Sequence, residues 1–359
     1  MRHCQLRGPD NTPQRARFPV IDAHNHLWSA WDRIDDVVAT MDATGVVAYC
    51  DLTADINVRF ANGGNVVAPG DFLVFLDKAS RPHPGKFYAF TTAGMMRPPS
   101  EPLYANSSRF VEQTLETLRA HHALGALGLK LGKEFGMIYR NTAGNLINCD
   151  DPVFQPIWAE AARLGMPVLI HEADPIAFFD AMTDENEQLA VLKEFPAWSF
   201  VDRSRYPTFE ELQTRYWNLA ASNPATTFLY PHLANWPENL DFLSERLANH
   251  PNVCMDFSAR CDEIGRQPYR ARAWIIQWQD RIFFGTDMPA TVEMYRFHFR
   301  FLETFDEYFL PPFVDGTFGR HRWCVYGLGL PDSVLQKIYY RNILRILPSL
   351  KNRVQIDLC

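Results

Sequence analysis

The chain has 359 residues, of which 47% are hydrophobic and 13% aromatic, and a net charge of −7. This length exceeds that of an average domain but fits one (β/α)8 barrel with insertions. The composition supplies enough apolar surface for a large core. No basic block or Lys/Arg stripe occurs, so we expect no nucleic-acid partner.

Short runs rich in Val, Ile and Phe alternate with longer amphipathic stretches, which is typical of βα units around a parallel sheet. Eight strands are predicted at residues 18–24, 45–53, 86–94, 125–131, 166–171, 225–232, 252–258 and 281–287. Helices are predicted at residues 32–43, 71–79, 108–122, 152–164, 208–221, 237–248, 268–278, from 291 onward, and 331–347. This order predicts an α/β fold: a (β/α)8 TIM barrel with extended βα loops over residues 18–359, preceded by an N-terminal arm at residues 1–17.

Several connections are longer than a barrel needs. Residues 132–149 form a polar connection with a predicted hairpin, and Gly63–Gly64 is expected in a flexible loop. Residues 172–206 follow the fifth strand, where long connections cover the active site, so they predict a lid or specificity wall. The aromatic residues 305–313 indicate a subunit interface, a lid or a core extension. We expect a homo-oligomer, most simply a dimer.

The cysteine pattern and the apolar runs bear on the cell compartment. Seven cysteines are scattered along the chain without a CxxC motif. This odd, irregular set does not suit a disulfide framework, so we expect a reducing compartment, the cytoplasm. The polar N-terminus lacks the apolar segment of a signal peptide, and no uncharged apolar run approaches the ~20 residues that cross a bilayer. We therefore expect no membrane partner.

Metal-ligating side chains fall at the carboxyl ends of four predicted strands: His24 and His26, then His171, His232 and Asp287. This rim is where barrel enzymes keep their active sites. Residues i and i+2 of a strand face the same side, so His24 and His26 can reach one ion. Imidazole and carboxylate ligands suit zinc, with manganese or iron as alternatives. The pattern predicts one divalent metal ion.

Each of these residues also has a structural explanation by itself. An isolated HxH pair is weak evidence for a metal, and a single histidine such as His171 is more often a satisfied core or rim residue. Asp287 in GTDMP can cap the following helix. Such explanations would have to hold at four separate strand ends, and the joint pattern favours a metal site.

The motifs VIDAHNH, PVLIHEAD, YPHLANWPENL, RIFFGTDMP and GLGLPDSVLQKIYYRNILRIL appear in this order from about residue 18 to 347. Together they resemble the amidohydrolase-related family of the amidohydrolase superfamily, which includes aminocarboxymuconate-semialdehyde decarboxylase and γ-resorcylate decarboxylase. The resemblance implies a metal bound by His24, His26, His171 and Asp287. It also implies that His232 is a catalytic or neighbouring histidine rather than an obligatory ligand.

The match departs from the family at two points. The strand-six motif often reads His-x-Gly, but here position 234 is Ala. Lys130 occupies the place where some relatives carry a carbamylated lysine that bridges two metals; an ordinary lysine that pairs with Glu172 or with a substrate anion is the alternative.

Arg260 directly follows the seventh strand and is a candidate to clamp a substrate carboxylate. A salt bridge to Asp262 or Glu263 is the alternative. Arg203 and Tyr206, on the long fifth connection, are further candidates for substrate binding.

These residues predict a metal-dependent hydrolase that acts on a small carbonyl- or carboxylate-bearing substrate through a metal-activated water. In this mechanism the catalytic residues are Asp287, which moves the proton of the water, and His232, which stabilises the developing oxyanion. Non-oxidative decarboxylation of a small unsaturated or aromatic acid is the alternative, with the same residues. A metal-free lactonase or a non-catalytic binding barrel is a second alternative.

Overall fold

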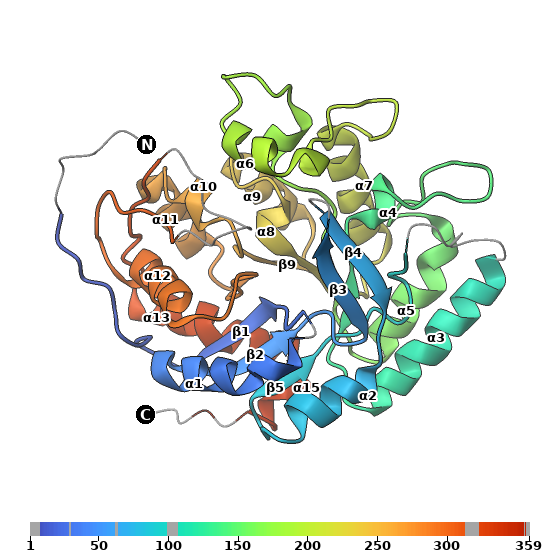
Figure 1. Ribbon diagram of the computed structural model, residues 1–359, viewed down its shortest axis with the longest axis horizontal. Coiled ribbons are helices and arrows are strands. Elements are labelled where there is room, and N and C mark those ends of the chain that lie inside the picture. Colours follow the sequence, from blue (N-terminus) through green and yellow to red (C-terminus); the bar gives the residue numbers. More distant parts are fainter. Residues whose placement is uncertain are drawn as a thin grey trace.

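Parallel strands in a closed ring form the centre of the molecule, shown in Figure 1. The computed structural model describes residues 8–28, 30–61, 64–98, 107–312, 323–354 and 356. One sheet contains β1 (Val20–Asn25), β2 (Val46–Asp51) and β5 (Phe87–Ala89) in that order. The other contains β6 (Leu129–Leu131), β7 (Val168–Ile170), β8 (Phe228–Tyr230), β9 (Val253–Asp256) and β10 (Ile282–Phe283).

Backbone contacts close these two sheets into one barrel. A parallel bridge between Thr91 and Leu129 joins the β5 end to β6. On the other side, Ala23 N donates to the carbonyl of Phe284 at 3.1 Å, which joins β1 to the end of β10. At this seam a Cβ atom on Gly285 would lie 2.5 Å from the Cβ of His24, so only glycine fits there. The predicted (β/α)8 barrel is confirmed.

Amphipathic helices surround the strands and bury their apolar faces in one continuous core. Their ends follow local sequence signals: Thr208 and Glu211 form a reciprocal capping box at the start of α7, and Asp71 caps α2. Among the described residues, no helix has both the length and the low polarity required to cross a bilayer. The outer helices are α1 (Ile34–Thr44), α2 (Phe72–Phe75), α3 (Ser107–Ala123), α5 (Gln155–Arg163), α7 (Phe209–Ser222), α9 (Leu240–Asn249), α11 (Pro268–Gln277), α12 (Val292–Glu303), α13 (Asp332–Gln336), α14 (Asn342–Ile346) and α15 (Pro348–Lys351).

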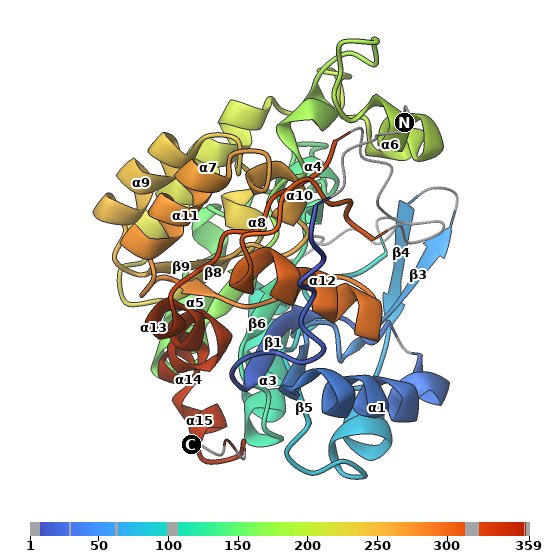
Figure 2. The ribbon, with the colours of Figure 1, turned by 90° about the vertical axis from the view of Figure 1, so that its left-hand side faces the viewer.

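An antiparallel hairpin lies between β2 and β5, where only a loop was predicted. It consists of β3 (Ile56–Ala61) and β4 (Gly64–Pro69), paired from Ile56↔Pro69 to Ala61↔Gly64. In Figure 2 it extends toward the end of the barrel where α6 (Leu189–Glu194) lies. Its residue Val58 reaches the cavity at the barrel mouth.

Residues 172–206, which follow β7, were predicted to form a lid or specificity wall. This segment lies over the same end of the barrel (Figures 1 and 2). It contains α6 and two short 3-10 helices, Ile176–Phe179 and Pro196–Trp198. A separate apolar cluster stabilises it, formed by Met137, Ala173, Phe178, Phe179, Leu192, Phe200, Phe209 and Leu212. Through this cluster the lid packs against Met137 and against Phe209 and Leu212 of α7.

The described part of the N-terminal arm packs on the outside of the barrel. The backbone and side chain of Asn11 donate to the carboxylate of Asp306, and Arg17 N donates to Glu303 at 3.0 Å. The expected interface at residues 305–313 includes residue 313, which lies outside the described residues. Within the described part, Phe305 and Leu310 are exposed.

Candidate metal centre and substrate cavity

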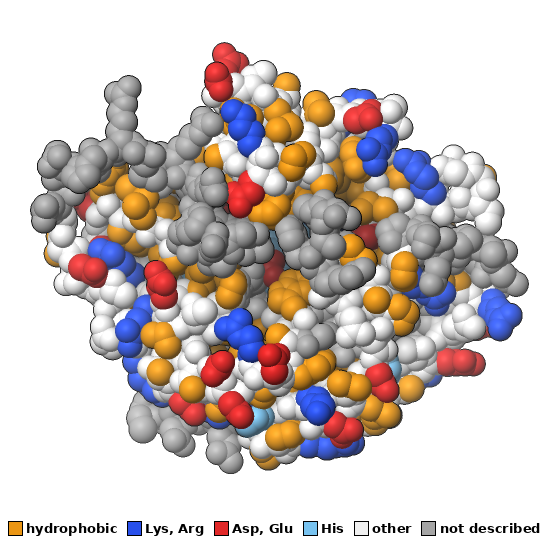
Figure 3. Space-filling model, viewed as in Figure 1, with side chains coloured by type: hydrophobic (Ala, Val, Ile, Leu, Met, Phe, Trp, Pro, Cys, Tyr) orange, Lys and Arg blue, Asp and Glu red, His pale blue; other side chains and the backbone are white. Residues whose placement is uncertain are grey.

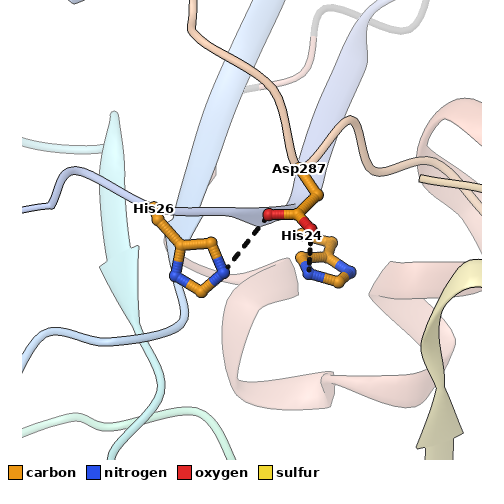
Figure 4. Close-up of side chains that lie close together, drawn as sticks. All are labelled: His24, His26 and Asp287. Carbon is orange, nitrogen blue, oxygen red and sulfur yellow. Dashed lines mark ion pairs between the residues drawn. The ribbon is translucent and has the colours of Figure 1, made fainter. Parts of the chain in front are cut away.

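His24, His26 and Asp287 converge at the seam between the first and last strands (Figure 4). One ligand atom from each lies within 4.8 Å of the others. Asp287 Oδ1 is 3.4 Å from His26 Nε2, and Asp287 Oδ2 is 3.7 Å from His24 Nε2. The residues thus face a common point, as the strand positions predicted.

Hydrogen bonds behind His24, on β1, and His26, directly after β1, hold their Nε2 atoms toward that point. His24 Nδ1 lies 2.8 Å from Asp256 Oδ2, an acceptor, so Nδ1 carries the proton and donates. His26 Nδ1 pairs with Thr53 Oγ1 at 2.9 Å, and this hydroxyl lies 3.2 Å from Asp51 Oδ1. His24 Nε2 is buried with no hydrogen-bond partner among the described residues. An unprotonated, buried Nε2 is what a divalent metal ion requires, so these residues fit such an ion.

His232 approaches the same carboxylate from the end of β8. Its Nε2 lies 3.5 Å from Asp287 Oδ2 and has no hydrogen-bond partner among the described residues. Its Nδ1 lies 2.8 Å from the carbonyl oxygen of Ser258, which can only accept. The ring is therefore in the Nδ1–H tautomer, and its Nε2 lone pair faces the site.

The backbone around His232 is strained. The short turn α8 (Pro231–Ala234) contains left-handed φ values of 58° at His232, 53° at Leu233 and 51° at Ala234, and Asn235 follows at 62°. A left-handed conformation costs about 1–2 kcal/mol for each non-glycine residue. Such strain persists only where the surroundings impose it, as functional sites do. Here it turns His232 back into the barrel mouth.

His171 lies beside this group but is not one of the three converging residues. Its ring centroid is 4.6 Å from that of His232. Its Nε2 is buried and lies 3.5 Å from Asp174 Oδ1. The role of His171 as a fourth metal ligand therefore stays a prediction.

Burial shifts the pKa values of the groups at this site. It raises the pKa of Asp287, although the charges of His24 and Lys130 oppose the shift. It lowers the pKa of His26 and of His232 well below the usual value, with further lowering by neighbouring cationic groups. Burial also lowers the pKa of Lys130 to about 8. Both histidines are therefore neutral at neutral pH, the state in which imidazole binds a metal or accepts a proton.

A cavity of about 430 Å³ is lined by His26 and Asp287 of this group. Figure 3 shows the face of the molecule that is seen in Figure 1, and hydrophobic side chains lie around the centre of this face. The lining combines aromatic and apolar side chains with polar and charged ones. The apolar lining consists of Trp28, Val58, Pro175, Phe178, Val191, Trp198, Ala259, Met288 and Pro289, and the polar lining includes His26, Lys133, His171, Asp174, Gln188, His232, Arg260 and Asp287. This volume suits a small organic molecule.

Arg260 lines this cavity and is only 7% exposed. Its Nη1 donates to the carbonyl of Ala259 at 2.7 Å, and its Nε has no partner among the described residues. The ion pair to Asp262 or Glu263 that was the alternative is not formed. A buried guanidinium with an unused donor suits a substrate anion.

The other predicted substrate-binding residues lie elsewhere. Arg203 donates to the carbonyls of Pro207 and Phe179, and Tyr206 packs on the ring of Phe200 at 5.1 Å. Neither residue lines the cavity, because both are used to hold the lid together. These two placements correct the prediction from sequence.

Lys130 is buried on β6 and points to the side of the barrel where His171 lies. It pairs in register with Leu169, two residues before His171, so the next residue, Glu172, faces the other way. Glu172 contacts the thiol of Cys149 instead. The alternative pairing of Lys130 with Glu172 is therefore wrong. The charge of Lys130 acts on Asp287 and Glu134.

Sequence reasoning missed a set of supporting residues. Asp256 and Ser258 lie behind His24 and His232, and Thr53 lies behind His26. At the cavity wall, Lys133 forms an ion pair with Asp174. The i, i+2 spacing of Asp256 and Ser258 at a strand end is the same signal that identified His24 and His26.

Comparison with known families agrees with this geometry. A family model described as Amidohydrolase matches residues 21–348. The chain belongs to this family, and it is an enzyme of the amidohydrolase superfamily. No curated protein matches the sequence at a significant level.

Solved structures with the same fold share little sequence with the chain. A TIM-barrel protein from Bordetella bronchiseptica has 13% identity and a TM-score of 0.54, with 93% of this chain and 99% of that chain covered. A 2,6-dihydroxybenzoate decarboxylase from Rhizobium has 16% identity and a TM-score of 0.52, covering 92% and 99%. A dihydroxybenzoic acid decarboxylase from Polaromonas sp. JS666, with bound manganese and the inhibitor 2-nitroresorcinol, has 14% identity and a TM-score of 0.53, covering 92% and 97%.

Proposed function

We propose that this protein is a metal-dependent hydrolase that acts on a small molecule bearing a carbonyl or carboxylate group. The observation that carries the proposal is the convergence of His24, His26 and Asp287 beneath a cavity lined by His232 and Arg260. A divalent ion at this point, zinc or manganese, would supply an activated water and polarise a carbonyl oxygen.

The protein's own residues then have distinct roles. Asp287 lines the cavity and can take the proton of the attacking water and return it to the leaving group. His232 presents an unprotonated Nε2, so it acts as an acceptor or base and not as the hydrogen-bond donor to an oxyanion that the sequence suggested. Arg260 holds a carboxylate of the substrate. The aromatic side chains of the cavity exclude water from the apolar part of the substrate.

Non-oxidative decarboxylation of an aromatic or unsaturated acid is the second candidate. Trp28, Phe178 and Trp198 give the cavity flat apolar surfaces that suit a conjugated ring. Two structural neighbours are named as decarboxylases of dihydroxybenzoates, and one of them holds manganese. In this reaction Arg260 would hold an oxygen substituent of the substrate. Asp287, or His232 once it has taken up a proton at Nε2, would deliver the proton that replaces the carboxyl group, which leaves as CO₂.

The test of the metal site is the double variant His24→Ala/His26→Ala. We expect it to lose its bound metal, measured by elemental analysis, together with all turnover, while circular dichroism shows an intact fold. A folded variant that keeps about one ion per chain would contradict the assignment. Activity in wild-type protein stripped by a chelator would favour a metal-free lactonase, and absence of both metal and turnover would favour a binding barrel.

A screen of lactones, amides, esters and aromatic acids separates the two reactions. In ¹⁸O-labelled water a hydrolysis places one labelled oxygen in the newly formed carboxylate of the organic product. Release of CO₂ together with an organic product that carries no label identifies a decarboxylase and overturns the hydrolase proposal.

A further inference from the structure

Asp256, at the end of β9, lies behind His24 and His232, whose ring centroids are 5.0 Å apart. The side chain is fully buried. Its Oδ2 accepts from His24 Nδ1 at 2.8 Å. Its Oδ1 accepts from the backbone N of His232 at 2.9 Å, from Ser258 N at 3.0 Å and from Ser258 Oγ at 2.5 Å. The carboxylate of Asp256 thus holds the His24 side chain with Oδ2 and the backbone of His232 with Oδ1.

Ser258 connects the two rings directly. Its hydroxyl proton goes to Asp256 Oδ1, so the oxygen lone pairs are free to accept. Ser258 Oγ lies 3.0 Å from His24 Nδ1 and 3.0 Å from His232 Nδ1. The Ser258 carbonyl also accepts from His232 Nδ1 at 2.8 Å. Both rings are thereby fixed with the proton on Nδ1 and a lone pair on Nε2.

The strained turn at His232 needs such an anchor. Its left-handed residues are held at their ends by the bond from His232 N to Asp256 and by Gln213 Nε2, which donates to the carbonyl of Ala234 at 2.7 Å. Without the first bond, the backbone at His232 could relax to a right-handed or extended conformation, and the ring would leave the cavity.

We propose that Asp256 and Ser258 are positioning residues that orient His24 and His232 as one unit, so that metal binding and the placement of His232 depend on the same two side chains. The proposal rests on the proposed function in that it takes His24 as a metal ligand. The proposal predicts that a substitution which breaks the hydrogen bond at Nδ1 of one histidine also changes the orientation of the other.

Asp256→Asn is the sharpest substitution because it keeps the shape and removes one acceptor. If the amide nitrogen replaces Oδ2, it meets the Nδ1–H of His24, which also donates. If the side chain flips, the nitrogen meets three donors, from His232 and Ser258. In either orientation one half of the arrangement breaks. Ser258→Ala leaves the bond between Asp256 and His24 in place. It removes the acceptor that the two rings share and the hydroxyl that donates to Asp256 Oδ1.

The experiment measures Zn²⁺ affinity by chelator competition, and the ring tautomers by NMR of protein labelled with ¹⁵N-histidine. We expect Asp256→Asn to weaken Zn²⁺ binding by about 10- to 100-fold and to change the tautomer of at least one of the two rings. For Ser258→Ala we expect a loss of at most about tenfold, with the Nδ1–H tautomer kept at both rings, because the Ser258 carbonyl and Asp256 Oδ2 still accept from them. The ¹⁵N signals of both rings should shift, since both lose their contact with the Ser258 hydroxyl oxygen. Asp306→Asn, another buried carboxylate that contacts Asn11 and Arg300, is the matched control and should change neither.

Two results would overturn the proposal. One is a folded Asp256→Asn protein with wild-type Zn²⁺ affinity and wild-type tautomers; the other is a wild-type protein in which either ring carries its proton on Nε2. If Asp256→Asn does not fold, Ser258→Ala decides: a shift of the ¹⁵N signals of both rings supports the proposal, and a shift at only one ring or at neither overturns it. If the wild-type protein binds no Zn²⁺, the proposed function fails, but the tautomers of the metal-free protein still test the positioning role.

Discussion

His232 Nε2 lies 3.5 Å from Asp287 Oδ2, so the two groups best placed to move protons share one edge of the cavity. His232 follows β8 and Asp287 follows β10 in the chain, and β9 lies between these two strands in the sheet. A metal ion bound to Asp287 would therefore have His232 as its neighbour without needing it as a ligand.

The first prediction concerns His232. Because its Nε2 is free and its Nδ1 is held by Ser258, His232→Asn should lower kcat by about 10²- to 10⁴-fold while the metal content stays at the wild-type level. Steady-state kinetics and elemental analysis check this on the substrate found by the screen. His298→Asn, a buried histidine held by the Met294 carbonyl outside the cavity, is the control and should keep kcat. Loss of the metal in His232→Asn would make His232 a ligand instead.

The second prediction concerns Arg260. Loss of a charged hydrogen bond to a substrate carboxylate costs about 1.5–3 kcal/mol, so Arg260→Ala should raise KM by roughly 10- to 150-fold. Arg260→Lys should recover only part of this, because an ammonium cannot form two parallel bonds to a carboxylate. Initial-rate kinetics give both values, with Arg345→Ala, an exposed arginine, as the control. An unchanged KM in Arg260→Ala would leave the residue with a purely structural role.

The third prediction concerns Ala234, which has a φ of 51° where relatives often carry glycine. Glycine adopts this conformation without steric cost, although it loses more entropy on folding. Ala234→Gly should therefore stabilise the protein by about 0.5–1 kcal/mol, measured by denaturant unfolding. Ala220→Gly, inside helix α7, should destabilise it by a similar amount. Destabilisation by Ala234→Gly would mean that the methyl group of this buried residue matters more than its backbone.

The fourth prediction concerns acid stability. Hydrogen bonds from Arg163 and Arg119 lower the pKa of Glu160 from 4.5 to about 2. A lowered pKa in the folded state stabilises the protein above the unfolded value, and this contribution is lost as the pH falls from 4.5 toward 2. Since both arginines are largely exposed, each pair contributes at most about 1 kcal/mol. Glu160→Gln should reduce the free energy of unfolding at pH 7 and flatten its decrease across this window; an unchanged slope would contradict the shift.

The order and the ends of the strands could be predicted from the apolar runs of the sequence. Because the carboxyl ends of all strands in a parallel barrel lie at one rim, the residues at these ends could also be predicted to meet. This rule placed His24, His26, His232 and Asp287 correctly relative to one another. The same rule would have found Asp256 and Ser258, had their i, i+2 spacing been given the weight of the HxH pair. The hairpin β3–β4 also left a signal, since the Asn-Gly step at residues 62–63 lies between two β-prone runs.

The lid could not be predicted in the same way. Arg203 and Tyr206 are polar residues on a long connection, which is all that the sequence shows. Their actual contacts with Phe179 and Phe200 depend on how the lid folds on its own apolar cluster. Local patterns do not encode such packing, so the direction of an individual side chain on the lid was open.

Gly285 has a consequence for how the protein matures. The seam where it passes His24 joins the first strand to the last, and the same seam brings His24 and His26 to Asp287. A ribosome-bound chain that has not yet released β10 has the two imidazoles but neither the carboxylate nor a closed ring of strands. The proposed ligand set is thus complete only late in biosynthesis, and a chain truncated before this strand would lack Asp287 at any metal concentration.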